Sequence, residues 1–384
     1  MKKTFSILLI IFPIFCFGQT INFSDINFKN ALLNNNCVDI DNDGFPDTNA
    51  DTNNDGEIQL TEAESIIGLH LSSSYIQSMN EISYFVNLQH LSVINNNLTS
   101  LDVSQLIYLV KLYVYNNYQL NSLILPQTNS LEELLCFNNI LNSLDISNNT
   151  NLKILHCYNN GLTNLDISQN LILEDLQCGG ISNPNLLTNI DLTQHINLKE
   201  FGCHNCLISN IDLSQNINLE SLHLQQNNLT ELDLSQNTSL NTLSCQNNEL
   251  TLLNIKNGNN NFLSMLAYNN PNLTCIEVDD VNYANNSGWN INNTQAQYNL
   301  DCSNLSILEF DKPEIEIYPN PTKSKLNIKS KAQIEQVIIY SILGKFIRKK
   351  LNTSMIDISE FDSGIYFLKI KAKNSISTIK IIKE

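Results

Sequence analysis

The sequence predicts a mainly β protein: a solenoid of about ten stacked coils followed by a small C-terminal β-sandwich-like domain. Three observations lead to this prediction. A pattern of apolar residues and Asn recurs about every 21 residues through the middle of the chain. Near residue 310 the composition changes to short runs of alternating apolar and polar residues. The charge changes there too, from −25 over residues 19–310 (5 Lys, 30 Asp and Glu) to +6 over residues 311–384 (14 Lys and Arg, 8 Asp and Glu).

The repeat is clearest in residues 152–170, where apolar residues occupy positions 1, 4, 6, 11, 14 and 16 and Asn occupies position 9. Side chains alternate along a strand, so positions 4 and 6 should point inward and positions 3, 5 and 7 outward. One coil cannot bury its apolar face alone, but coils stacked about 4.8 Å apart share a continuous core. The register begins at Ile66 in a degenerate form and then at Leu88, Leu109, Leu131, Leu152, Leu173, Leu198, Leu219, Leu240 and Leu263.

This L-x-x-L-x-[LC]-x-x-[NC] pattern resembles the leucine-rich repeat, in the subclass with two similar halves per coil that is found in many bacterial surface proteins. The nested halves predict two strand-like sides per coil and a β-rich solenoid without helices outside. The Asn at position 9 should satisfy backbone groups at the turn after the strand, and Cys206 takes this place in one repeat. The position-9 residues are Asn96, Asn117, Asn139, Asn160, Asn227 and Asn248.

The chain begins with features of an export signal. Lys2 and Lys3 precede an apolar run that is too short to span a membrane, and Gly18 is a small residue at a suitable cleavage point. Lipidation of Cys16 is the alternative, which the lack of a preceding small residue disfavours. No later segment is apolar enough to cross a bilayer. We therefore expect a signal peptide at 1–18, an N-terminal cap at 19–65, the solenoid at 66–278, a C-terminal cap and linker at 279–310, and a separate domain at 311–384.

Residues 315–384 contain six alternating runs, at 315–318, 325–329, 336–340, 345–348, 364–371 and 375–382. Three landmarks occur in order: Y-P-N-P at 318–321, Y-S-I-L-G at 340–344 and S-G-I-Y-F-L-K at 363–369. These features resemble the C-terminal sorting domain of type IX secretion substrates in Bacteroidetes. The resemblance implies export across both membranes, the type IX machinery as a partner, and a secreted or outer-surface location after removal of the domain.

Residues 39–62 contain two acidic loops. The second acidic loop, residues 51–62, follows the EF-hand pattern, with oxygen ligands at alternate positions and Gly56 at the sharp turn. The first acidic loop, residues 39–47, is the weaker match because Pro46 replaces the apolar residue and Ala50 the closing Glu, and it resembles the shorter calcium loops of extracellular proteins. Oxygen-only ligand sets favour calcium. The expected ligands are Asp39, Asp41, Asp43 and Asp47, then Asp51, Asn53, Asp55, Glu57 (through its carbonyl) and Glu62.

The alternative is a solvated acidic linker without a cation. We favour calcium because carboxylates packed this close repel one another unless a cation lies between them. The expected role is structural: together with a short amphipathic helix within residues 23–33, the two loops would cap the open end of the repeat stack.

The cysteines fall into two groups. Those at position 6 are expected to be small buried hydrophobic residues; metal ligation is the alternative, although no His shares the inward positions. Cys275 and Cys302 are expected to form a disulfide, since Cys275 should point outward, Cys302 lies in the expected cap, and exported chains reach an oxidising compartment. The position-6 cysteines are Cys136, Cys157, Cys178, Cys203 and Cys245.

The outward positions of the first strand form one continuous surface. Aromatic residues in adjacent coils are typical of surfaces that bind protein or glycan, but strands favour them without any ligand as well, and both interpretations stay open. We name as the aromatic face Tyr113, Tyr115, Phe137, His156, Tyr158, His204 and His223. On the second side, a solvated face or weak cation binding would explain Asp102, Asp145, Asp166, Asp191, Asp212 and Asp233.

The sequence argues against two functional classes. It contains no nucleophile elbow, phosphate loop, H-E-x-x-H or paired-cysteine metal motif, so we expect no enzyme. The acidic body would repel nucleic acid. We expect instead a secreted or cell-surface binding protein, stabilised by calcium, that recognises protein or glycan, including in adhesion. The alternative is a structural surface-coat protein without a specific partner.

Overall fold

The computed structural model divides the chain into two compact units, Met1–Cys302 and Ser303–Glu384, which we describe separately. The expected signal peptide up to residue 17 and the linker at 303–314 lie outside the described residues. The structure describes residues 18–41, 43–260, 263–291, 295–302, 315–330, 333–342, 344–372 and 375–384.

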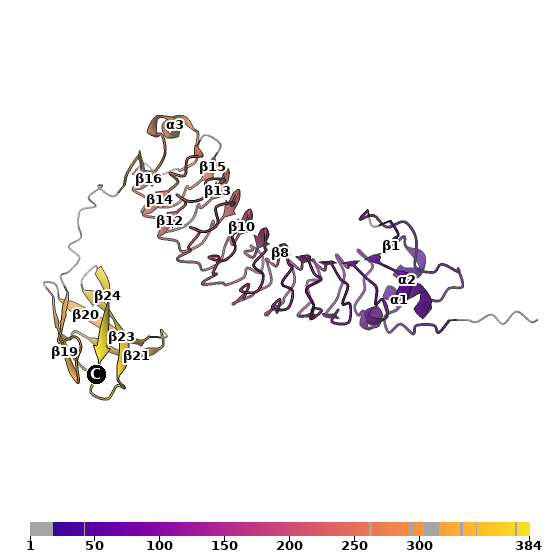
Figure 1. Ribbon diagram of the computed structural model, residues 1–384, viewed down its shortest axis with the longest axis horizontal. Coiled ribbons are helices and arrows are strands. Elements are labelled where there is room, and N and C mark those ends of the chain that lie inside the picture. Colours follow the sequence, from indigo (N-terminus) through magenta and orange to yellow (C-terminus); the bar gives the residue numbers. More distant parts are fainter. Residues whose placement is uncertain are drawn as a thin grey trace, which may run out of the picture. The chain divides into compact units, whose positions relative to one another are not determined.

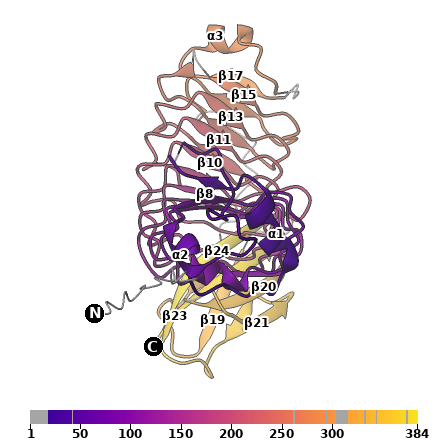
Figure 2. The same ribbon diagram turned by 90° about the vertical axis from the view of Figure 1, so that its right-hand side faces the viewer.

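The first unit is a stack of coils whose first sides form one 11-stranded sheet (Figure 1). The first strand is antiparallel to the second, and every later neighbour is parallel. Figure 2 shows the strands following one another along the stack. In order they are β1 (Val38–Asp39), β2 (Gly68–His70), β3 (His90–Ser92), β5 (Lys111–Tyr113), β7 (Glu133–Leu135), β8 (Ile154–His156), β9 (Asp175–Gln177), β10 (Glu200–Gly202), β11 (Ser221–His223), β13 (Thr242–Ser244) and β15 (Ser264–Leu266).

The register of this sheet confirms the predicted repeat. Leu134 of β7 pairs with Leu112 of β5 on one side and with Leu155 of β8 on the other, so equivalent positions of successive coils stack on one another. These leucines have no exposed surface, as the inward positions require. Each buried side chain of this kind contributes roughly 1.5–3 kcal/mol, and the core they form is continuous through the stack.

The second sides of the coils are less regular than predicted. Strands form near the two ends of the stack, whereas the coils between residues 140 and 215 pass the second side without a strand. Their inward side chains, such as Leu165 and Ile167, are nevertheless buried, so side-chain packing persists where the backbone ladder stops. The strands of the second side are β4 (Ser100–Asp102) with β6 (Ser122–Ile124), and β12 (Glu231–Asp233), β14 (Leu252–Asn254), β16 (Cys275–Glu277) and β17 (Gln297–Asn299).

The position-9 Asn side chains join consecutive coils. Asn139, which is 2 % exposed, donates through Nδ2 to the carbonyls of Cys136 (2.7 Å) and Val114 (3.1 Å), and its Oδ1 accepts from the Asn117 amide (2.9 Å). These bonds satisfy backbone groups that a buried turn would otherwise leave unpaired. The residue before it, Asn138, is left-handed (φ 56°), a conformation that Asn tolerates better than most residues.

Two positions of the repeat differ from the sequence expectation. The last coil was placed to start at Leu263, but Met265 pairs with Leu243 and Asn270 makes the position-9 hydrogen bonds, so this coil starts one residue earlier. Leu266 then points outward. Because Leu266 is apolar, the sequence pattern wrongly assigned it to an inward position. In the long repeat that begins at Leu173, an insertion follows the strand, and Asn185 replaces the position-9 Asn. Asn185 donates to the carbonyls of Cys157 and Cys178 at 3.0 and 2.9 Å.

Both ends of the stack are capped (Figure 1). At the N-terminal end, α1 (Ile26–Asn34) buries Phe28 and Leu32, and its N-cap Asp25 also accepts the amides of Gln77 (2.6 Å) and Ser78 (3.0 Å) in the first coil. The other helices there are α2 (Leu60–Ser65) and the 3₁₀ helix η1 (Asn80–Tyr84). At the C-terminal end, α3 (Val281–Asn286) leads to Trp289, whose indole N–H donates to the Leu263 carbonyl at 2.9 Å.

The second unit contains two antiparallel sheets that share one core, in agreement with the predicted small β domain. Leu326 and Ile356 from one sheet and Val337 and Leu368 from the other are buried together. A short strand at 355–357 was missed in the sequence because it has only three residues. The sheets are β18 (Glu316–Tyr318), β19 (Lys325–Lys329) and β22 (Met355–Asp357), and β21 (Phe346–Leu351), β20 (Ile334–Ser341), β23 (Gly364–Ala372) and β24 (Ser375–Lys383).

Candidate functional site

Three rings of the aromatic face form a continuous stack. Tyr115, Phe137 and Tyr158 follow strands β5, β7 and β8 at position 7 of consecutive coils. Their ring centroids are 4.3 and 4.4 Å apart, and their planes are within 12° of parallel. The spacing is that of the coils themselves, about 4.8 Å, tightened slightly by contact between the rings. Each ring is half-buried, so the stack is a ridge that presents edges and hydroxyl groups to solvent.

Polar pairs flank this ridge on the strands. Lys111 lies 2.9 Å from Glu133, and the Tyr113 hydroxyl donates a short hydrogen bond to the same carboxylate. Although burial opposes it, these hydrogen bonds hold the pKa of Glu133 below its usual range. His156 lies 2.7 Å from Asp175 on the next coil. The face therefore combines a rigid aromatic stack with side chains that neighbouring strands hold in place.

His204 and His223 continue the aromatic face beyond a gap in the stack. Position 7 of the intervening coil is Gly179, where a Cβ atom would lie 2.3 Å from the backbone oxygen of His204. Burial lowers the pKa of both histidines, and His223 lowers that of His204 further. A lowered pKa favours the neutral imidazole, which can donate and accept hydrogen bonds.

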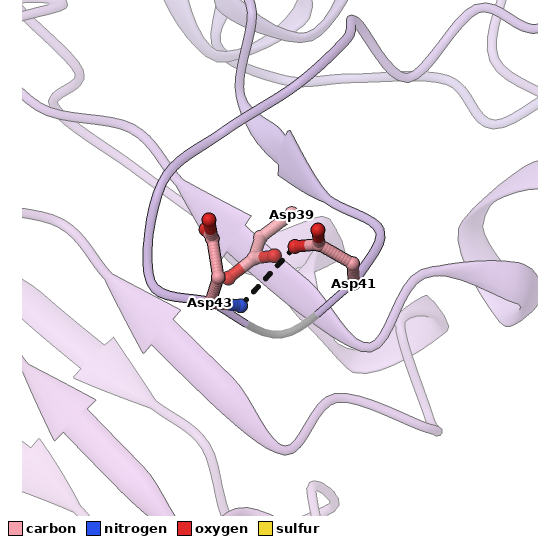
Figure 3. Close-up of side chains that lie close together, drawn as sticks. All are labelled: Asp39, Asp41 and Asp43. Atoms are coloured by element: carbon pink, nitrogen blue, oxygen red, sulfur yellow. Dashed lines mark hydrogen bonds between the residues drawn. The ribbon is translucent and has the colours of Figure 1, made fainter.

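The first acidic loop brings three carboxylates together. Asp39, Asp41 and Asp43 each offer an oxygen, and these oxygens lie within 4.8 Å of one another (Figure 3). The same groups accept backbone amides: Gly44 donates to Asp39 (2.9 Å), Phe45 to Asp43 (2.8 Å) and Asp43 to Asp41 (3.3 Å). The fourth expected ligand, Asp47, instead accepts the amide of Ile40 at 2.9 Å. Three convergent oxygen ligands on a hydrogen-bonded loop fit a hard cation such as calcium.

The second acidic loop repeats part of this arrangement. Gly56 donates to Asp51 and Glu57 to Asp55, both at 2.9 Å, as Gly44 and Phe45 do in the first loop. Its other ligand groups, however, are engaged by donors of the protein. Gln59 donates to both oxygens of Asp55 (3.2 and 3.0 Å).

The remaining side chains of the second acidic loop are engaged as well. Glu62 accepts the amide and hydroxyl of Thr52 (both 2.8 Å) and the amide of Gln59 (2.9 Å). The Asn53 side chain donates to Gln59 (2.7 Å), and the Glu57 side chain pairs with Lys29 (2.7 Å). The three carboxylates that lie within 4.8 Å of one another belong to the first loop, and calcium binding by the second loop stays a prediction.

A cavity of about 140 Å³ joins the first acidic loop to the aromatic face. Asp43 and Gly44 form one wall, and His90, Lys111 and Tyr113 line the sheet side. Other lining residues are His70, Leu91 and Ser92. Burial lowers the pKa of the His70 imidazole, whose Nε2 lies 3.7 Å from Asp39. The loop thus contributes directly to one end of the surface that carries the aromatic face.

The cysteine and aspartate ladders have local structural roles. All five position-6 cysteines are buried, and burial raises the pKa of Cys136 and Cys245 to about 12. Cys275 and Cys302 form a disulfide with their Cα atoms 6.0 Å apart. Each second-side aspartate accepts the amide two residues later, as Asp166 does from Ser168 at 2.9 Å, which makes these residues turn caps. The equivalent bonds are those of Asp102, Asp145, Asp191, Asp212 and Asp233.

Comparison with known proteins identifies the C-terminal unit. Residues 316–384 match the family described as the secretion system C-terminal sorting domain. A segment of 94 residues, 23 % of this chain, is 31 % identical to the ulvan lyase NLR42 of Nonlabens ulvanivorans and spans only 18 % of the length of that enzyme.

Solved structures similar to the chain are leucine-rich-repeat proteins. The functional domain of InlJ from Listeria monocytogenes, described as including a cysteine ladder, is 20 % identical, with a TM-score of 0.40, over 95 % of this chain and 98 % of that one. A leucine-rich-repeat protein of Leptospira interrogans is 20 % identical (TM-score 0.34; 62 % of this chain, 81 % of that one). Internalin C2 of Listeria monocytogenes is 18 % identical (TM-score 0.36; 58 % and 84 %).

The molecule is thus a leucine-rich-repeat solenoid followed by a sorting domain. The repeat register and hydrogen-bonded Asn ladder establish the first part, and the family match establishes the second. It is exported, to the medium or to the outer cell surface, by the secretion system that reads this domain. Among the described residues, we find no helix with the length and apolarity needed to span a bilayer.

Proposed function

We propose that the exported protein is a binding protein that contacts a protein ligand through the aromatic face. The observation that carries this proposal is the stack of Tyr115, Phe137 and Tyr158. Large side chains held rigid before binding lose little conformational entropy when a partner covers them. Aromatic residues are also the side chains most enriched among the energetically important contacts of protein interfaces.

The ring arrangement favours a protein over a glycan as the ligand. Sugars pack flat against aromatic faces, but both faces of Phe137 are covered by its neighbours. Phe137 therefore exposes only its ring edge, which carries partial positive charge, and the two tyrosines add phenol hydroxyls to the ridge. Aliphatic side chains and backbone carbonyls of a polypeptide suit this surface.

The charge of the surroundings favours a basic partner. The strands beside the ridge carry Lys111 against Glu133, Asp175 and Glu200, and the solenoid as a whole is strongly acidic. A basic ligand surface would associate faster with this side of the protein at low ionic strength, because opposite charges steer the encounter.

Array binding tests this proposal. Fluorescently labelled mature protein is applied to protein and glycan arrays, and the double variant Tyr115→Ala with Phe137→Ala is compared with the matched control Tyr108→Ala with Tyr118→Ala. The control tyrosines are 56 % and 69 % exposed and lie outside the aromatic face. We expect protein spots to lose at least tenfold in signal with the first variant only. Retained binding would rule out this face, and binding confined to glycan spots would rule out a protein ligand.

We further propose that calcium orders the N-terminal cap. The three convergent carboxylates of the first acidic loop support this, since mutual repulsion would open the loop without a cation. Asp39, Asp41 and Asp43 would hold the ion, which would supply charge neutralisation and fix the loop that forms one wall of the cavity beside Tyr113. In the second acidic loop, the Gln59 amide would have to release Asp55 before that carboxylate could bind an ion.

Thermal melts of the calcium-stripped protein test this second proposal. Calcium at about 100 times its Kd should stabilise the folded protein by about 2.7 kcal/mol. Asp41→Asn with Asp43→Asn should abolish the shift in melting temperature, whereas Glu64→Gln, an exposed carboxylate outside both loops, should not change it. An unchanged shift in the double variant would exclude the first acidic loop as the site.

A further inference from the structure

Two buried thiols lie in contact within one turn of the solenoid. Cys203 at position 6 and Cys206 at position 9 have their sulfur atoms 3.2 Å apart. They are 0 % and 5 % exposed. The two residues between them include His204, which belongs to the aromatic face.

Cys206 interrupts the amide ladder of the coils on either side. In the preceding coil, Asn185 donates to the carbonyls of Cys157 and Cys178 at 3.0 and 2.9 Å. In the following coil, Asn227 donates to the carbonyls of Cys203 and Leu224 at 2.7 and 3.1 Å.

The thiol of Cys206 replaces these bonds only weakly. Its sulfur lies 3.9 Å from the Cys178 carbonyl and 3.8 Å from the His204 carbonyl. A thiol is a weak donor with a single hydrogen, so hydrogen bonding alone gives Cys206 no advantage over the Asn found in most other coils.

A metal ion accounts for the pair less well than a covalent bond. Cys178 is the nearest further thiol along the cysteine ladder and forms a hydrogen bond with Cys203, but a soft metal would need three or four such ligands converging on one point. Across the part of the chain that the structure describes, the cluster of three metal-ligating groups within 4.8 Å is the acidic one at Asp39, Asp41 and Asp43, and it contains no cysteine.

We propose that Cys203 and Cys206 form a second disulfide in the exported protein. A disulfide has its sulfurs 2.03–2.05 Å apart, so the two atoms need to approach by roughly 1.2 Å from their present contact, within the reach of side-chain rotation. Exported chains meet disulfide-forming conditions that cytoplasmic chains do not.

The reaction is a thiol–disulfide exchange. The thiolate of one cysteine attacks a disulfide of the oxidant, either a protein or a small molecule, and displaces one thiol. The second cysteine then attacks the mixed disulfide, forms the Cys203–Cys206 bond and releases the second thiol. Two electrons and two protons thus pass from the cysteines to the oxidant. Because both sulfurs are buried in the folded coil, this exchange precedes or accompanies folding.

The bond would fix part of the aromatic face. His204 lies inside the four-residue ring, and its backbone already lies so close to Gly179 that a Cβ atom there would be 2.4 Å from its nitrogen. Closing the ring would restrain this backbone and so the point from which the imidazole projects. This consequence rests on the proposed function of the face, but the existence of the bond does not.

Peptide mass mapping tests the proposal on the full chain as it is exported by a host with the secretion system. The protein is denatured without reductant, alkylated with iodoacetamide and digested with trypsin and Glu-C. The peptide of residues 201–220 contains Cys203 and Cys206 and no other cysteine. We expect it to carry no label and to weigh two hydrogens less than the dithiol peptide. The peptide of residues 175–199 contains only Cys178 and should carry one label.

Two labels on the 201–220 peptide would overturn the proposal, as would a missing label on Cys178, which would indicate a different pairing. The variant Cys206→Asn provides the second measurement. Asn occupies this position in neighbouring coils, so the variant should fold and should carry one label on Cys203. An unlabelled Cys203 in that variant would show that its partner is not Cys206. Array binding is measured separately, so a failure of the proposed function leaves this result unchanged.

Discussion

Replacing Asn160 by Ala should destabilise the solenoid by about 3 kcal/mol. Asn160 is fully buried, and its Oδ1 accepts the Leu141 amide at 3.1 Å. Its Nδ2 donates to the carbonyls of Cys136 at 3.0 Å and Cys157 at 2.9 Å, and more weakly to that of Tyr158 at 3.4 Å. The variant removes all of these bonds and changes no residue of the aromatic face.

The expected loss of stability depends on which backbone groups lose all of their hydrogen-bond partners. The two carbonyls keep one donor each, because Asn139 also bonds to Cys136 and Asn185 to Cys157. Losing the second bond to each costs about 0.5 kcal/mol, at the lower end for a hydrogen bond. The Leu141 amide keeps no side-chain acceptor in a buried turn, which costs roughly 1–3 kcal/mol.

Urea unfolding followed by far-UV circular dichroism measures the effect. Asn151→Ala is the matched control, since Asn151 is exposed immediately before this coil and its loss should change stability by less than about 0.5 kcal/mol. If Asn160→Ala destabilises the protein no more than Asn151→Ala does, the amide ladder does not join the coils in the way described here.

Three further variants test other parts of the structure. His195 stands where neighbouring coils have Asn, and burial lowers its pKa, so its stabilising neutral form is present above pH about 6.5 and is lost as the pH falls through the lowered pKa. At the equivalent position Asn170 donates to the Ile146 and Asn149 carbonyls, so His195→Asn should add about 1 kcal/mol and should reduce the loss of stability in acid melts. Gly179→Ala should cost about 2–3 kcal/mol in urea unfolding, because its Cβ would meet the His204 backbone; a neutral effect would contradict that close approach. Cys275→Ser should cost about 3–4 kcal/mol on the loop-entropy account, since the disulfide partners are 27 residues apart, and an unchanged melting temperature would argue against the bond.

The repeat was predictable because its physics is periodic. Leu134 and Leu155 occupy equivalent sequence positions and therefore pair in the sheet. The buried Asn residues were recognised for the same reason. The sorting domain was recognisable from three landmarks, and its short strand at 355–357 was not, because three residues are too few for an alternating pattern.

What the sequence could not supply was the side-chain arrangement. The spacing of the second acidic loop predicted calcium ligands, with Glu62 closing the pattern, but it could not show that Glu62 also accepts hydrogen bonds from Thr52 and Gln59. The contact between Cys203 and Cys206 depends on how one turn folds. The stacking of Tyr115 on Phe137 could be expected from their spacing, but not the parallel ring planes that cover both faces of Phe137.

Hydroxyl-radical footprinting tests the central claim, that the aromatic face is the contact surface. The mature protein is oxidised with and without the ligand identified on the protein array, and side-chain oxidation is read by mass spectrometry. We predict that the ligand protects Tyr115, Phe137 and Tyr158 and leaves the exposed Tyr108 and Tyr118 unchanged. Protection of Tyr108 and Tyr118, with no change at the three stacked rings, would contradict the account.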